Sequence, residues 1–517
     1  HASVGWLAGE RLVLRTSTQV PFLTRDALAR IFGLPRERVR VFAARVGGGF
    51  GGKQEMFTED VVALAVLALG RPVQLEFSRE EQFTATSTRH PMQITVRAGA
   101  TADGRLTAMQ VRTMANTGAY GNHSVGVLFH SCAEAIELYR CANKQVDGWS
   151  VYTNTVPAGA FRGYGLSQSA FAVESALDEL ARRLDIDPIE FRRRNVVRPG
   201  DELQPALDPG DVEIRSYGLP QCLDAVDAVL AADDLPAGLD PADWQVGNGM
   251  AVSMLNTTPP GGHFAHARIA QTAAGGFRLY VGSAEFGNGS ATVHRQLAAG
   301  VLGASVDDIE LVAADTDLVE HDTGAYGSTG SVVAGMATMR AAESLRALLD
   351  SDAGDGTLLE ADGRCDGTPR SIAFTVHGFR VAVRPATGEL RILRSIQAVD
   401  AGTVLNPMQC RGQVEGGAAQ AIGAAMYEHV DLDETGRVTT RALREYHVPV
   451  SADVPRTEVF FADTSDPLGP MGAKPMSEAP FNPVAPALAN AVRDATGVRI
   501  TDLPMTRDRL YLALGGR

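Results

Sequence analysis

The spacing of apolar positions along the chain alternates between the period of a strand and the period of a helix. An Asp103-Gly104 pair predicts a hairpin turn in the first half, where the strands of 73–116 are expected to be antiparallel. In this half we expect strands over 12–17, 39–44, 73–77, 92–98 and 106–116, and helices over 20–32, 55–69, 167–184 and 188–195.

The alternation resumes in the second half after a stretch of turn-forming residues. Residues 198–245 carry Pro, Gly and Asp at turn spacing and include the best candidate for a domain boundary. The polar, Gly-rich segment 350–368 is expected to be a surface connection. Strands are expected near 265–271, 277–284, 308–314, 373–383 and 390–399, and helices over 291–302, 333–349, 413–427 and 486–495.

This order of elements predicts an α+β protein with two large mixed α/β domains. The first domain is expected over residues 1–205, a linker over 206–245 and the second domain over 246–517. No repeat of fixed period runs through the sequence.

Composition excludes several classes of protein. With 47 basic and 61 acidic residues the net charge is −14, which argues against nucleic acid or an anionic membrane as the main partner. The 54 glycines follow no fixed period, so collagen and simple linkers are excluded. The longest apolar run, 61–69, is shorter than the ~20 residues of a membrane span. Because the chain begins with His and shows no export signal, we expect a cytoplasmic piece of a longer product.

The five cysteines are odd in number and widely scattered. No two of them form a CxxC pair, so neighbouring residues cannot assemble a zinc site or a cysteine-ligated iron–sulfur cluster. Free thiols in a reducing cytoplasm are therefore expected. The cysteines are Cys132, Cys141, Cys222, Cys365 and Cys410.

Five Gly-rich loops are the clearest candidates for chemistry. One such loop is usually a plain turn, Arg162 alone would usually form a surface ion pair, and Glu478 would ordinarily be a carboxylate at a helix start. Three of the loops, however, run into expected helices, whose first backbone amides favour an anion such as phosphate. Together they predict one large phosphate-bearing cofactor held mostly by main chain. The loops lie at 47–55, 160–165, 285–292, 326–331 and 471–480.

Six motifs in a fixed order give the chain a resemblance to a known family. It resembles the molybdenum-binding subunit of the xanthine dehydrogenase and aldehyde oxidase family of molybdenum hydroxylases, nearly from end to end. The motifs are STQ at 17–19, GGGFGGK at 47–53, AFRGYG at 160–165, EFGNG at 285–289, DAGTVLNP at 400–407 leading into GQVEGG at 412–417, and the glutamate of 472–480 before a Pro-Ala-Leu helix.

The resemblance implies a molybdenum cofactor lying between the two domains. In this family a molybdopterin dithiolene holds the metal, often as a cytosine dinucleotide in bacteria, and water is used to hydroxylate an electron-poor carbon. Glu478 is implied as the general base that takes a proton from the metal's hydroxo ligand, and Gln19 as a hydrogen-bond partner of its oxo ligand. No side chain is implied as a ligand of the metal. The implied cofactor-binding residues are Gly49, Phe50, Gly51, Arg162, Gly287, Asn288, Gly289, Ser328, Thr329, Gly330, Ser331 and Gln413.

Three further residues are implied to bind the substrate. Tyr164 stands where the family often has an aromatic residue, and its flat face favours a planar ring, although an ordinary core tyrosine is the plain alternative. Gln54 and His130 stand where enzymes that oxidise xanthine have a glutamate and an arginine. Because an amide and an imidazole cannot replace those groups, xanthine is disfavoured, and a purine or nicotinate-like N-heteroaromatic is expected. Glu55 is an alternative carboxylate.

Electron transfer is implied to lie outside this chain. The family's usual path has two [2Fe-2S] clusters and FAD, and the five cysteines cannot supply the eight thiolates that the two clusters need. Partner subunits are therefore expected to hold the [2Fe-2S] clusters and FAD, with a dimer of such assemblies as one arrangement. In the loop before Glu478, Pro475 and Ser477 replace the glycines usual in the family, so the path of this loop is expected to differ.

Three alternatives differ in the activity they assign. An aldehyde oxidoreductase is the nearest, within the same family. Carbon monoxide oxidation is disfavoured because that branch has a cysteine in a loop that corresponds to 158–165, where this chain has none. A non-catalytic scaffold or insertion chaperone would keep the cofactor loops, but Gln19, Glu478 and an intact GGGFGGK favour catalysis.

Overall fold

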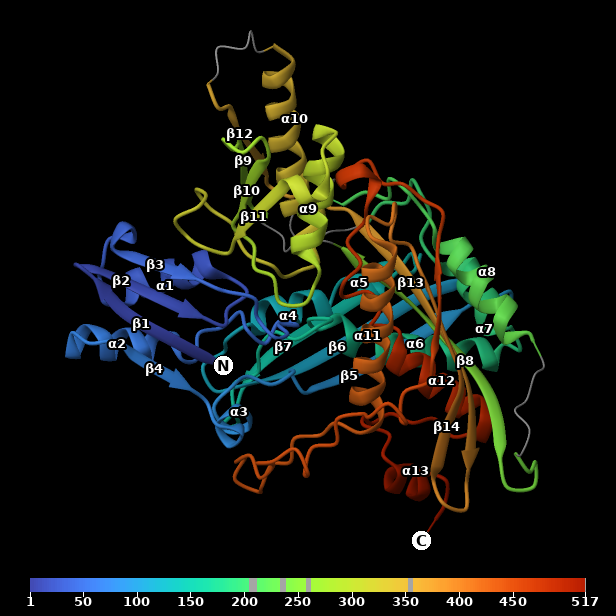
Figure 1. Cartoon of the computed structure of the whole chain (residues 1–517). Coiled ribbons are helices and arrows are strands. Elements are labelled where there is room, and N and C mark those ends of the chain that lie inside the picture. Colours follow the sequence, from blue (N-terminus) through green and yellow to red (C-terminus); the bar gives the residue numbers. More distant parts are fainter. Residues whose placement is uncertain (204–211, 233–238, 257–261, 352–356, 517) are drawn as a thin grey trace.

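The computed structural model describes residues 1–203, 212–232, 239–256, 262–351 and 357–516. Within these residues the strands form four sheets with helices packed against them (Figure 1). We refer to them as the N-terminal unit (β1–β4), the central sheet (β5–β7), the upper sheet (β9–β12) and the C-terminal sheet (β8 and β13–β15). The mixture of helix and strand confirms the expected α+β class.

The N-terminal unit is a sheet with the strand order β3-β2-β1-β4, packed against two helices. Leu12, Leu14 and Leu28 are fully buried between these elements. At Gly5, a Cβ would lie 2.8 Å from the Val62 side chain, so glycine lets α2 approach β1 closely. The elements are β1 (Ala2–Ala8), β2 (Arg11–Thr16), α1 (Pro21–Phe32), β3 (Val39–Phe42), α2 (Glu59–Leu69) and β4 (Val73–Glu76).

Two expectations for this region were wrong. The strand expected at 73–77 pairs with β1 and not with the strands that follow it, because it returns to the same sheet after α2. The helix expected from residue 55 begins at Glu59, whose carboxylate accepts hydrogen bonds from the backbone of Phe57 and Thr58 at 3.0 and 3.1 Å. Residues 55–58 therefore remain part of the Gly-rich loop.

The central sheet has the order β5-β6-β7, with β6 antiparallel to β5 and parallel to β7. The predicted turn at Asp103-Gly104 joins β5 to β6, and Gly104 adopts the positive φ of 81° that such a turn requires. The long helix α6 packs against this sheet through Val173 and Leu177, which are fully buried. The elements are α3 (Arg79–Thr84), β5 (Met92–Ala100), β6 (Leu106–Gly118), α4 (Ser124–Ser131), α5 (Glu134–Glu137), β7 (Lys144–Tyr152), α6 (Leu166–Arg183) and α7 (Pro188–Asn195).

The C-terminal sheet has the order β15-β14-β13-β8 and lies between helices α8 and α12. At Gly249 of β8 a Cβ would lie 2.0 Å from the backbone nitrogen of Ala491 in α12, whereas at Gly378 of β13 it would meet Val226 of α8 at 2.6 Å. The elements are α8 (Leu219–Leu230), β8 (Gln245–Asn256), β13 (Ile372–Arg384), β14 (Glu389–Val399), α11 (Pro407–Met426), β15 (Thr457–Phe461), α12 (Val484–Thr496) and α13 (Arg507–Ala513).

The upper sheet projects from the rest of the molecule (Figure 1) and has the order β11-β10-β9-β12. Gly363 of β12 lets helix α10 cross closely, because a Cβ there would lie 2.2 Å from the Ala337 carbonyl oxygen. The elements are β9 (Ala265–Gln271), β10 (Phe277–Val281), α9 (Ser290–Leu302), β11 (Ile309–Ala313), α10 (Gly335–Ser351) and β12 (Glu360–Cys365). A π-helix at Gly330–Ala334 precedes α10, and 3-10 helices lie at Arg36–Arg38, Val306–Asp308 and Pro470–Gly472.

Two segments that looked like connections contain regular structure. Helix α8 lies inside the predicted linker 206–245, and its residues Leu219 and Val226 are fully buried. Strand β12 lies inside 350–368 and pairs with β9. Its polar sequence lacks the apolar alternation that would have predicted a strand. Residues 206–211, 233–238 and 352–356 of these two segments lie outside the described residues. The domain limits themselves stay a prediction.

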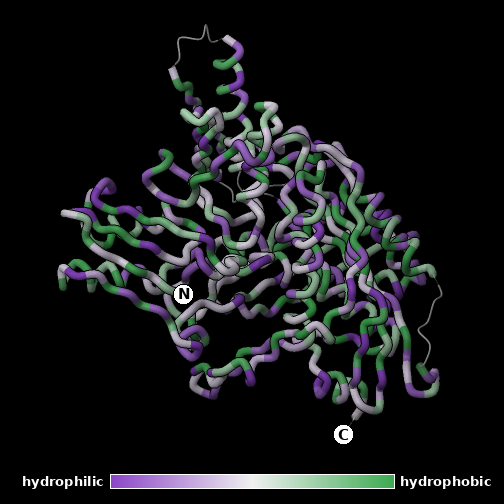
Figure 2. Tube along the Cα trace, viewed as in Figure 1, coloured by the Kyte–Doolittle hydropathy of each residue, from purple (hydrophilic) through white to green (hydrophobic). Residues whose placement is uncertain are grey.

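One hydrophobic core joins the two predicted domains. It combines residues of β6, α6 and α7 with residues of α8, β8 and β13. Within it the Glu174 carboxylate accepts a hydrogen bond from Arg192 at 2.8 Å and from the backbone of Val252 at 3.0 Å. Figure 2 shows hydrophobic and hydrophilic residues alternating along most of the strands and helices, as expected for elements with one buried face.

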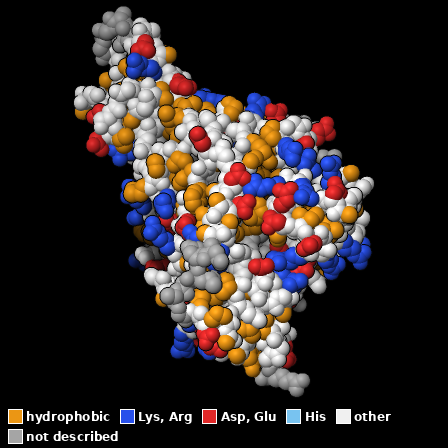
Figure 3. Space-filling model, turned by 90° about the vertical axis from the view of Figure 1, so that its right-hand side faces the viewer, with side chains coloured by type: hydrophobic (Ala, Val, Ile, Leu, Met, Phe, Trp, Pro, Cys, Tyr) orange, Lys and Arg blue, Asp and Glu red, His pale blue; other side chains and the backbone are white. Residues whose placement is uncertain are grey.

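The run of three arginines at 192–194 forms no basic patch. Arg192 is fully buried against Glu174, Arg193 pairs with Asp224 and Asp227 of α8, and Arg194 pairs with Glu190 at 2.8 Å. Figure 3 shows acidic and basic side chains intermixed on this side of the molecule. In the part of the chain that the structure describes, no helix combines the length and the apolar character needed to cross a bilayer.

Candidate active site

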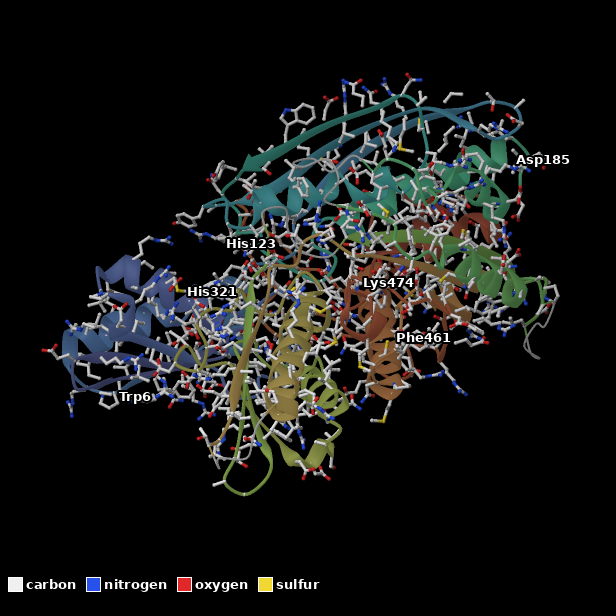
Figure 4. The ribbon with its side chains drawn as sticks, turned by 90° about the horizontal axis from the view of Figure 1, so that it is seen from above. Trp6, His123, Asp185, His321, Phe461 and Lys474 are labelled. Carbon is white, nitrogen blue, oxygen red and sulfur yellow. The ribbon has the colours of Figure 1, made fainter. Side chains whose placement is uncertain are left out.

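A cavity of about 700 Å³ lies where the four sheets approach one another, and all six motifs contribute to its wall. Figure 4 labels two residues of this wall, His123 and Lys474, near the middle of the molecule, whereas Trp6 and Asp185 lie at opposite ends. The expected site residues that line the cavity are Gln19, Phe50, Gly51, Gln54, His130, Arg162, Tyr164, Gly287, Asn288, Ser328, Thr329, Gly330, Ser331, Gln413 and Glu478. The structure thus brings these residues together, and their individual roles stay predictions.

Two expected residues, Gly49 and Gly289, lie behind the wall. A Cβ at Gly49 would lie 2.7 Å from the Gln19 side chain, and one at Gly289 would lie 2.7 Å from the Gln409 side chain. Both glycines therefore leave room for a residue that does face the cavity.

Several helices begin at the cavity. The first residue of α6, the first residue of α9, the first residues of the π-helix and the first turn of α11 all belong to its wall. The N-terminus of a helix presents free backbone amides and the positive end of its dipole, which together favour an anion. The cavity therefore suits a ligand that carries phosphate groups.

The N-terminus of α9 differs from this expectation. The carboxylate of Glu285 accepts hydrogen bonds from the backbone of Gly287, Gly289 and Ala291, at 2.7, 3.3 and 2.9 Å. These amides are thus already paired with an anionic side chain of the same loop. The glutamate at the start of EFGNG could have predicted this pairing from the sequence, but attention to the glycines of the motif left it unnoticed.

Gln19 is held by hydrogen bonds from two loops. Its side-chain oxygen accepts from the backbone of Gly51 and Lys53 at 3.1 and 3.3 Å, and its side-chain nitrogen donates to the Ala325 carbonyl at 2.8 Å. Only 1% of Gln19 is exposed. The amide is therefore fixed in orientation, and its second N–H is left for a ligand in the cavity.

Glu478 is oriented by two serines. Ser328 donates to Glu478 Oε2 at 3.0 Å and accepts from the Glu478 backbone at 3.2 Å and from the Ser477 hydroxyl at 2.9 Å. Oε1 of Glu478 has no hydrogen-bond partner among the described residues. Ser477, which replaces a glycine usual in the family, therefore contributes a hydroxyl that supports this arrangement.

Arg162 anchors the loop of Glu478 from the opposite side. Its guanidinium donates to the carbonyl oxygens of Ser477 and Gln413, the latter at 3.1 Å. Only 5% of Arg162 is exposed. Burial lowers the pKa of Arg162 to about 10, with the Glu478 carboxylate acting in the opposite direction, so the guanidinium stays charged at neutral pH. The surface ion pair that is the usual role of a lone arginine is thus excluded here.

Tyr164 forms an aromatic part of the wall in a strained conformation. Its φ is +36°, and a Cβ at Gly126 would lie 2.7 Å from its hydroxyl, so a small neighbour is needed. The hydroxyl lies 2.7 Å from His123 Nδ1, and the ring contacts the His130 ring edge-to-face at a centroid distance of 5.6 Å. Burial raises the pKa of the phenol, which therefore stays neutral. Because Tyr164 lines the cavity, it is not an ordinary core residue.

Glu55 does not face the cavity. Its Oε1 accepts hydrogen bonds from the Ala160 backbone at 3.1 Å, from Asn122 at 2.9 Å and from Ser87 at 3.3 Å. It also needs Gly159, where a Cβ would lie 2.1 Å from the carboxylate. Glu55 therefore holds the AFRGYG loop and is not among the residues of the cavity wall, whereas Gln54 does line the cavity.

Sequence reasoning missed several residues that support the site. Arg89 donates to the Arg162 carbonyl at 2.8 Å, and Lys474 lines the cavity while its ammonium group lies 2.6 Å from Asp400. No local pattern marks Arg89. Glu134 lies 2.5 Å from His130, and the four-residue spacing of this pair was a usable signal.

The residues of the cavity fit a molybdopterin-type cofactor. Two side-chain oxygens in the wall, on Asn256 and Gln409, are buried without a hydrogen-bond partner among the described residues, as acceptors that await a ligand would be. Within the same residues, no three His, Cys, Asp or Glu side chains gather closely enough to hold a metal ion.

Comparisons with known proteins agree with this assignment. The family described as molybdopterin cofactor-binding domain matches residues 1–196, and a second such family matches residues 231–363 and 355–455. A protein of Escherichia coli (strain K12) described as "probable hypoxanthine oxidase" is 35% identical over 99% of this chain and 58% of its own length. The xanthine dehydrogenase molybdenum-binding subunit of Escherichia coli O157:H7 is 33% identical over 98% of this chain and 74% of its own.

A solved structure extends the likeness to the whole fold. Quinoline 2-oxidoreductase from Pseudomonas putida 86 superposes with a TM-score of 0.91 and 27% identity, covering all of this chain and 74% of the other. The chain thus spans between 58% and 74% of the length of these relatives.

Proposed function

Because the chain belongs to the molybdenum-binding subunits of the xanthine dehydrogenase and aldehyde oxidase family, we propose that it hydroxylates an N-heteroaromatic substrate, such as a purine or a nicotinate-like ring. In the net reaction a ring C–H becomes C–OH, the oxygen comes from water, and two protons and two electrons are released. The cofactor, when bound, supplies the two-electron oxidation. The observation that carries the proposal is the arrangement of Glu478, Gln19 and Tyr164 around one cavity.

Glu478 acts as the general base in this proposal. Ser328 fixes one carboxylate oxygen at 3.0 Å, while Arg162 holds the carbonyl oxygen of the preceding residue. Because these contacts fix the carboxylate group, Oε1 of Glu478 keeps a set orientation and is available to take a proton from the water-derived nucleophile. A fixed base loses little orientational freedom when the substrate reacts.

Gln19 orients the cofactor in this proposal. Two backbone amides hold its oxygen, so the N–H that is not bound to Ala325 points in a set direction. An amide donor so placed suits an oxygen ligand of the metal. Arg162, the backbone of Ser328 and the N-termini of α6 and α11 would hold the pterin and its phosphate.

The apolar residues of the cavity support a planar substrate. Phe50, Val125 and Leu23 line the cavity and remain 44%, 83% and 38% exposed, so an apolar surface leads inward from solvent. Further in, Tyr164 and Phe129 add aromatic surface. Aromatic rings pack well against such surfaces. The structural relative that acts on quinoline is consistent with a heteroaromatic ring here.

The finer features of the cofactor and of the assembly belong to the same proposal. The unpartnered oxygens of Asn256 and Gln409 support a cofactor with hydrogen-bond donors beyond the pterin, as the cytosine dinucleotide form has. In this proposal the electrons pass to partner subunits that hold two [2Fe-2S] clusters and FAD in the cytoplasm, because the five free cysteines of this chain are too few for the eight thiolates of two such clusters.

The test is the Glu478→Gln variant in the mature holoenzyme with its partners. We expect unchanged molybdenum and pterin content, but at least about a hundredfold slower dye reduction with hypoxanthine or nicotinate, because the amide cannot accept the proton. Benzaldehyde in the same assay tests the aldehyde oxidoreductase alternative. If benzaldehyde alone is turned over, the substrate class proposed here is wrong.

Glu415→Gln is the matched control. Glu415 lies exposed on α11 and pairs with Arg411 at 2.9 Å, outside the cavity. The same chemical change there should leave turnover within about twofold of the parent. Unchanged turnover in Glu478→Gln would contradict the catalytic role and favour the scaffold alternative.

A further inference from the structure

A short segment of the chain contacts both residues that the proposed function places beside the cofactor. We call residues 324–329 the bridging segment. The Gln19 side chain donates to the Ala325 carbonyl oxygen at 2.8 Å, and the Ala325 backbone donates to the Gln19 carbonyl oxygen at 3.1 Å. Three positions further on, the Ser328 hydroxyl donates to Glu478 Oε2 at 3.0 Å. A shift of the bridging segment would therefore move the contacts of Gln19 and Glu478 together.

The imidazole of His263 contacts the bridging segment at both of its ends and in its middle. Nε2 of His263 lies 2.8 Å from the Gly324 carbonyl oxygen and 3.1 Å from the Thr329 hydroxyl. The His263 ring also meets the Tyr326 ring edge-to-face, at a centroid distance of 4.9 Å. Only 3% of His263 is exposed, and it is not part of the cavity wall. His263 therefore holds the segment without facing the cavity itself.

His263 acts on the segment as a neutral hydrogen-bond donor. Because a carbonyl oxygen only accepts, Nε2 carries the proton of the bond to Gly324. The Thr329 hydroxyl donates its own hydrogen to the Tyr326 carbonyl oxygen at 2.6 Å, so toward Nε2 it is an acceptor. Burial lowers the pKa of His263 to about 4, and His321 acts in the same direction, whereas the bond to Gly324 acts against it. The uncharged ring is therefore the form present at neutral pH.

The backbone of Gly324 is held on both sides. Its N–H donates to the Asp322 carboxylate at 2.8 Å, and its carbonyl oxygen accepts from His263. Its φ is +115°, and a Cβ there would lie 2.5 Å from the Val20 side chain, so glycine is needed. No second donor to this carbonyl oxygen lies among the described residues. Loss of the imidazole N–H would therefore leave a buried acceptor unpaired.

We infer that His263 is a positioning residue of the reaction: through the bridging segment it fixes Glu478 relative to Gln19. The inference rests on the proposed function, because that function makes Glu478 the base and Gln19 the residue that orients the cofactor. The two residues lie on segments far apart in the sequence, and the bridging segment is hydrogen-bonded to both. A base held at a fixed place relative to the reacting atoms loses little orientational freedom in the transition state. His263 itself contacts neither residue, so its effect passes through the segment.

The experiment compares His263→Gln with His263→Asn in the mature holoenzyme with its partners. The Gln amide nitrogen can take the place of Nε2 and donate to the Gly324 carbonyl oxygen, whereas the shorter Asn ends near the place of Nδ1. Dye reduction is measured with whichever of hypoxanthine, nicotinate and benzaldehyde is turned over.

The two variants should differ in kcat. We expect kcat to fall at least about tenfold in His263→Asn while KM stays within about twofold, because the change disturbs the position of the base and not the binding of substrate. His263→Gln should keep kcat within about threefold of the parent. Equal kcat values in the two variants, or a change in KM alone, would overturn the inference.

His377 of β13 offers a matched control. It is fully buried, its Nε2 lies 3.2 Å from the Ser395 hydroxyl, and it is not part of the cavity wall. His377→Asn removes a buried imidazole in the same way but should leave kcat within about twofold of the parent. If it slows turnover as much as His263→Asn does, a general loss of packing explains both results and the inference is wrong.

Ser328→Ala tests whether His263 acts through the bridging segment. Without the hydroxyl that donates to Glu478, the segment no longer holds the base, so His263→Asn in this background should lower kcat by less than about threefold further. Effects of the two substitutions that multiply in full would show that His263 acts by another route, which contradicts the inference.

Hydrogen exchange of backbone amides gives a readout that needs no turnover. His263→Asn should raise the exchange rate of peptides that cover 322–331 and 476–482 at least about fivefold, because the Ala325 and Glu478 amides lose their fixed acceptors. His263→Gln should match the parent. Equal exchange in the two variants would overturn the inference, and if a variant takes up no molybdenum the comparison is made between the metal-free proteins. Unchanged turnover in Glu478→Gln would reject the proposed function without altering this comparison, so the two failures are distinguishable.

Discussion

The ammonium group of Lys474 lies 2.6 Å from Asp400 Oδ2, and neither side chain has any exposed surface. Lys474 also donates to the Ser216 carbonyl at 2.9 Å, while Asp400 accepts from the Gly218 backbone at 2.8 Å. The ion pair therefore joins the start of α8, the end of β14 and the loop that carries Glu478 four residues further on. The ion pair holds the loop that carries Glu478 in place, although neither of its members contacts Glu478.

Removal of one member of this pair should be strongly destabilising. Lys474→Met leaves the Asp400 carboxylate buried and without its cation, which should lower the free energy of unfolding by about 3–5 kcal/mol. The double variant Lys474→Met/Asp400→Leu should recover much of that loss, because no charge remains buried. Thermal unfolding of the three proteins measures both effects. Arg278→Ala, which breaks the exposed pair with Glu310, should cost less than about 1 kcal/mol, and an equal effect of the two single changes would contradict the argument.

Arg89 connects the cofactor loop to the loop of the base. Its guanidinium lies 4.7 Å from the centre of the Phe161 ring and 4.6 Å from that of Phe481, and it donates to the Arg162 carbonyl at 2.8 Å. Burial lowers the pKa of Arg89 to about 10, so it remains a cation at neutral pH. We expect Arg89→Lys to slow turnover at least about tenfold, because an ammonium group cannot stack on both rings and donate in the same plane.

The matching control for Arg89 is Arg105→Lys. Arg105 lies exposed in the hairpin between β5 and β6, with 81% of its side chain accessible, and should tolerate the change without effect. Steady-state dye reduction and molybdenum content, measured together, separate slower chemistry from loss of cofactor. Equal activity of Arg89→Lys and the control would show that Arg89 does not position the site.

Asp322 should make stability depend on pH near neutrality. Burial raises the pKa of Asp322 to about 7, although the Gly324 backbone donates to the carboxylate at 2.8 Å. In the unfolded chain the pKa is lower, so the folded state binds the extra proton, and stability falls as pH rises toward and through 7. The contribution has a slope of at most about 1.4 kcal/mol per pH unit.

The Asp322→Asn variant tests this linkage. It should lose the contribution, so that its unfolding temperature falls less than that of the parent between pH 5 and pH 8. The comparison is made at both pH values with each protein. Parallel curves for the two proteins would mean that Asp322 does not titrate as described.

Replacement of glycine by alanine should have opposite effects on stability at Gly249 and Gly300, because only the first glycine is tightly packed. Gly249→Ala in β8 places a Cβ 2.0 Å from the Ala491 backbone, so β8 and α12 must separate, and we expect a loss of about 3 kcal/mol or failure to fold. Gly300→Ala in α9 meets no atom within 4 Å and should stabilise the helix by about 0.5–1 kcal/mol. Chemical unfolding of both variants measures the difference. A destabilising Gly300→Ala would contradict the helix argument.

Local patterns predicted most of the elements. The spacing of apolar residues located α6 and α7 within one residue, because a long amphipathic face or a proline at the helix start leaves a strong local signal. It missed β12, whose polar sequence becomes a strand only because β9 offers a partner. It also missed α8, because the Pro and Gly residues around that helix resemble a linker. Pairing across the chain is not encoded in a short window.

The site shows the same division. The six motifs identified many residues of the cavity wall, because each motif is recognisable from its local sequence alone. They did not identify wall residues outside the motifs, such as Asn256 and Gln409. They did not show that Glu285 occupies the amides of α9, or that Glu55 turns to the Ala160 backbone and away from the cavity. Those outcomes depend on which hydrogen-bond donors lie within about 3 Å of a carboxylate, and folding sets that distance.

Read alone, the amino-acid sequence establishes the family, the cofactor class and the candidate base Glu478, because Gly-rich loops and an acidic residue at fixed places are local chemical requirements. The tertiary structure buries two pairs of side chains beside the cavity, Glu134 with His130 and Asp400 with Lys474. The first pair is close in sequence, and only the fold buries it at the wall of the cavity. The second joins residues 74 positions apart, and only the meeting of β14 with the loop of the base brings them into contact.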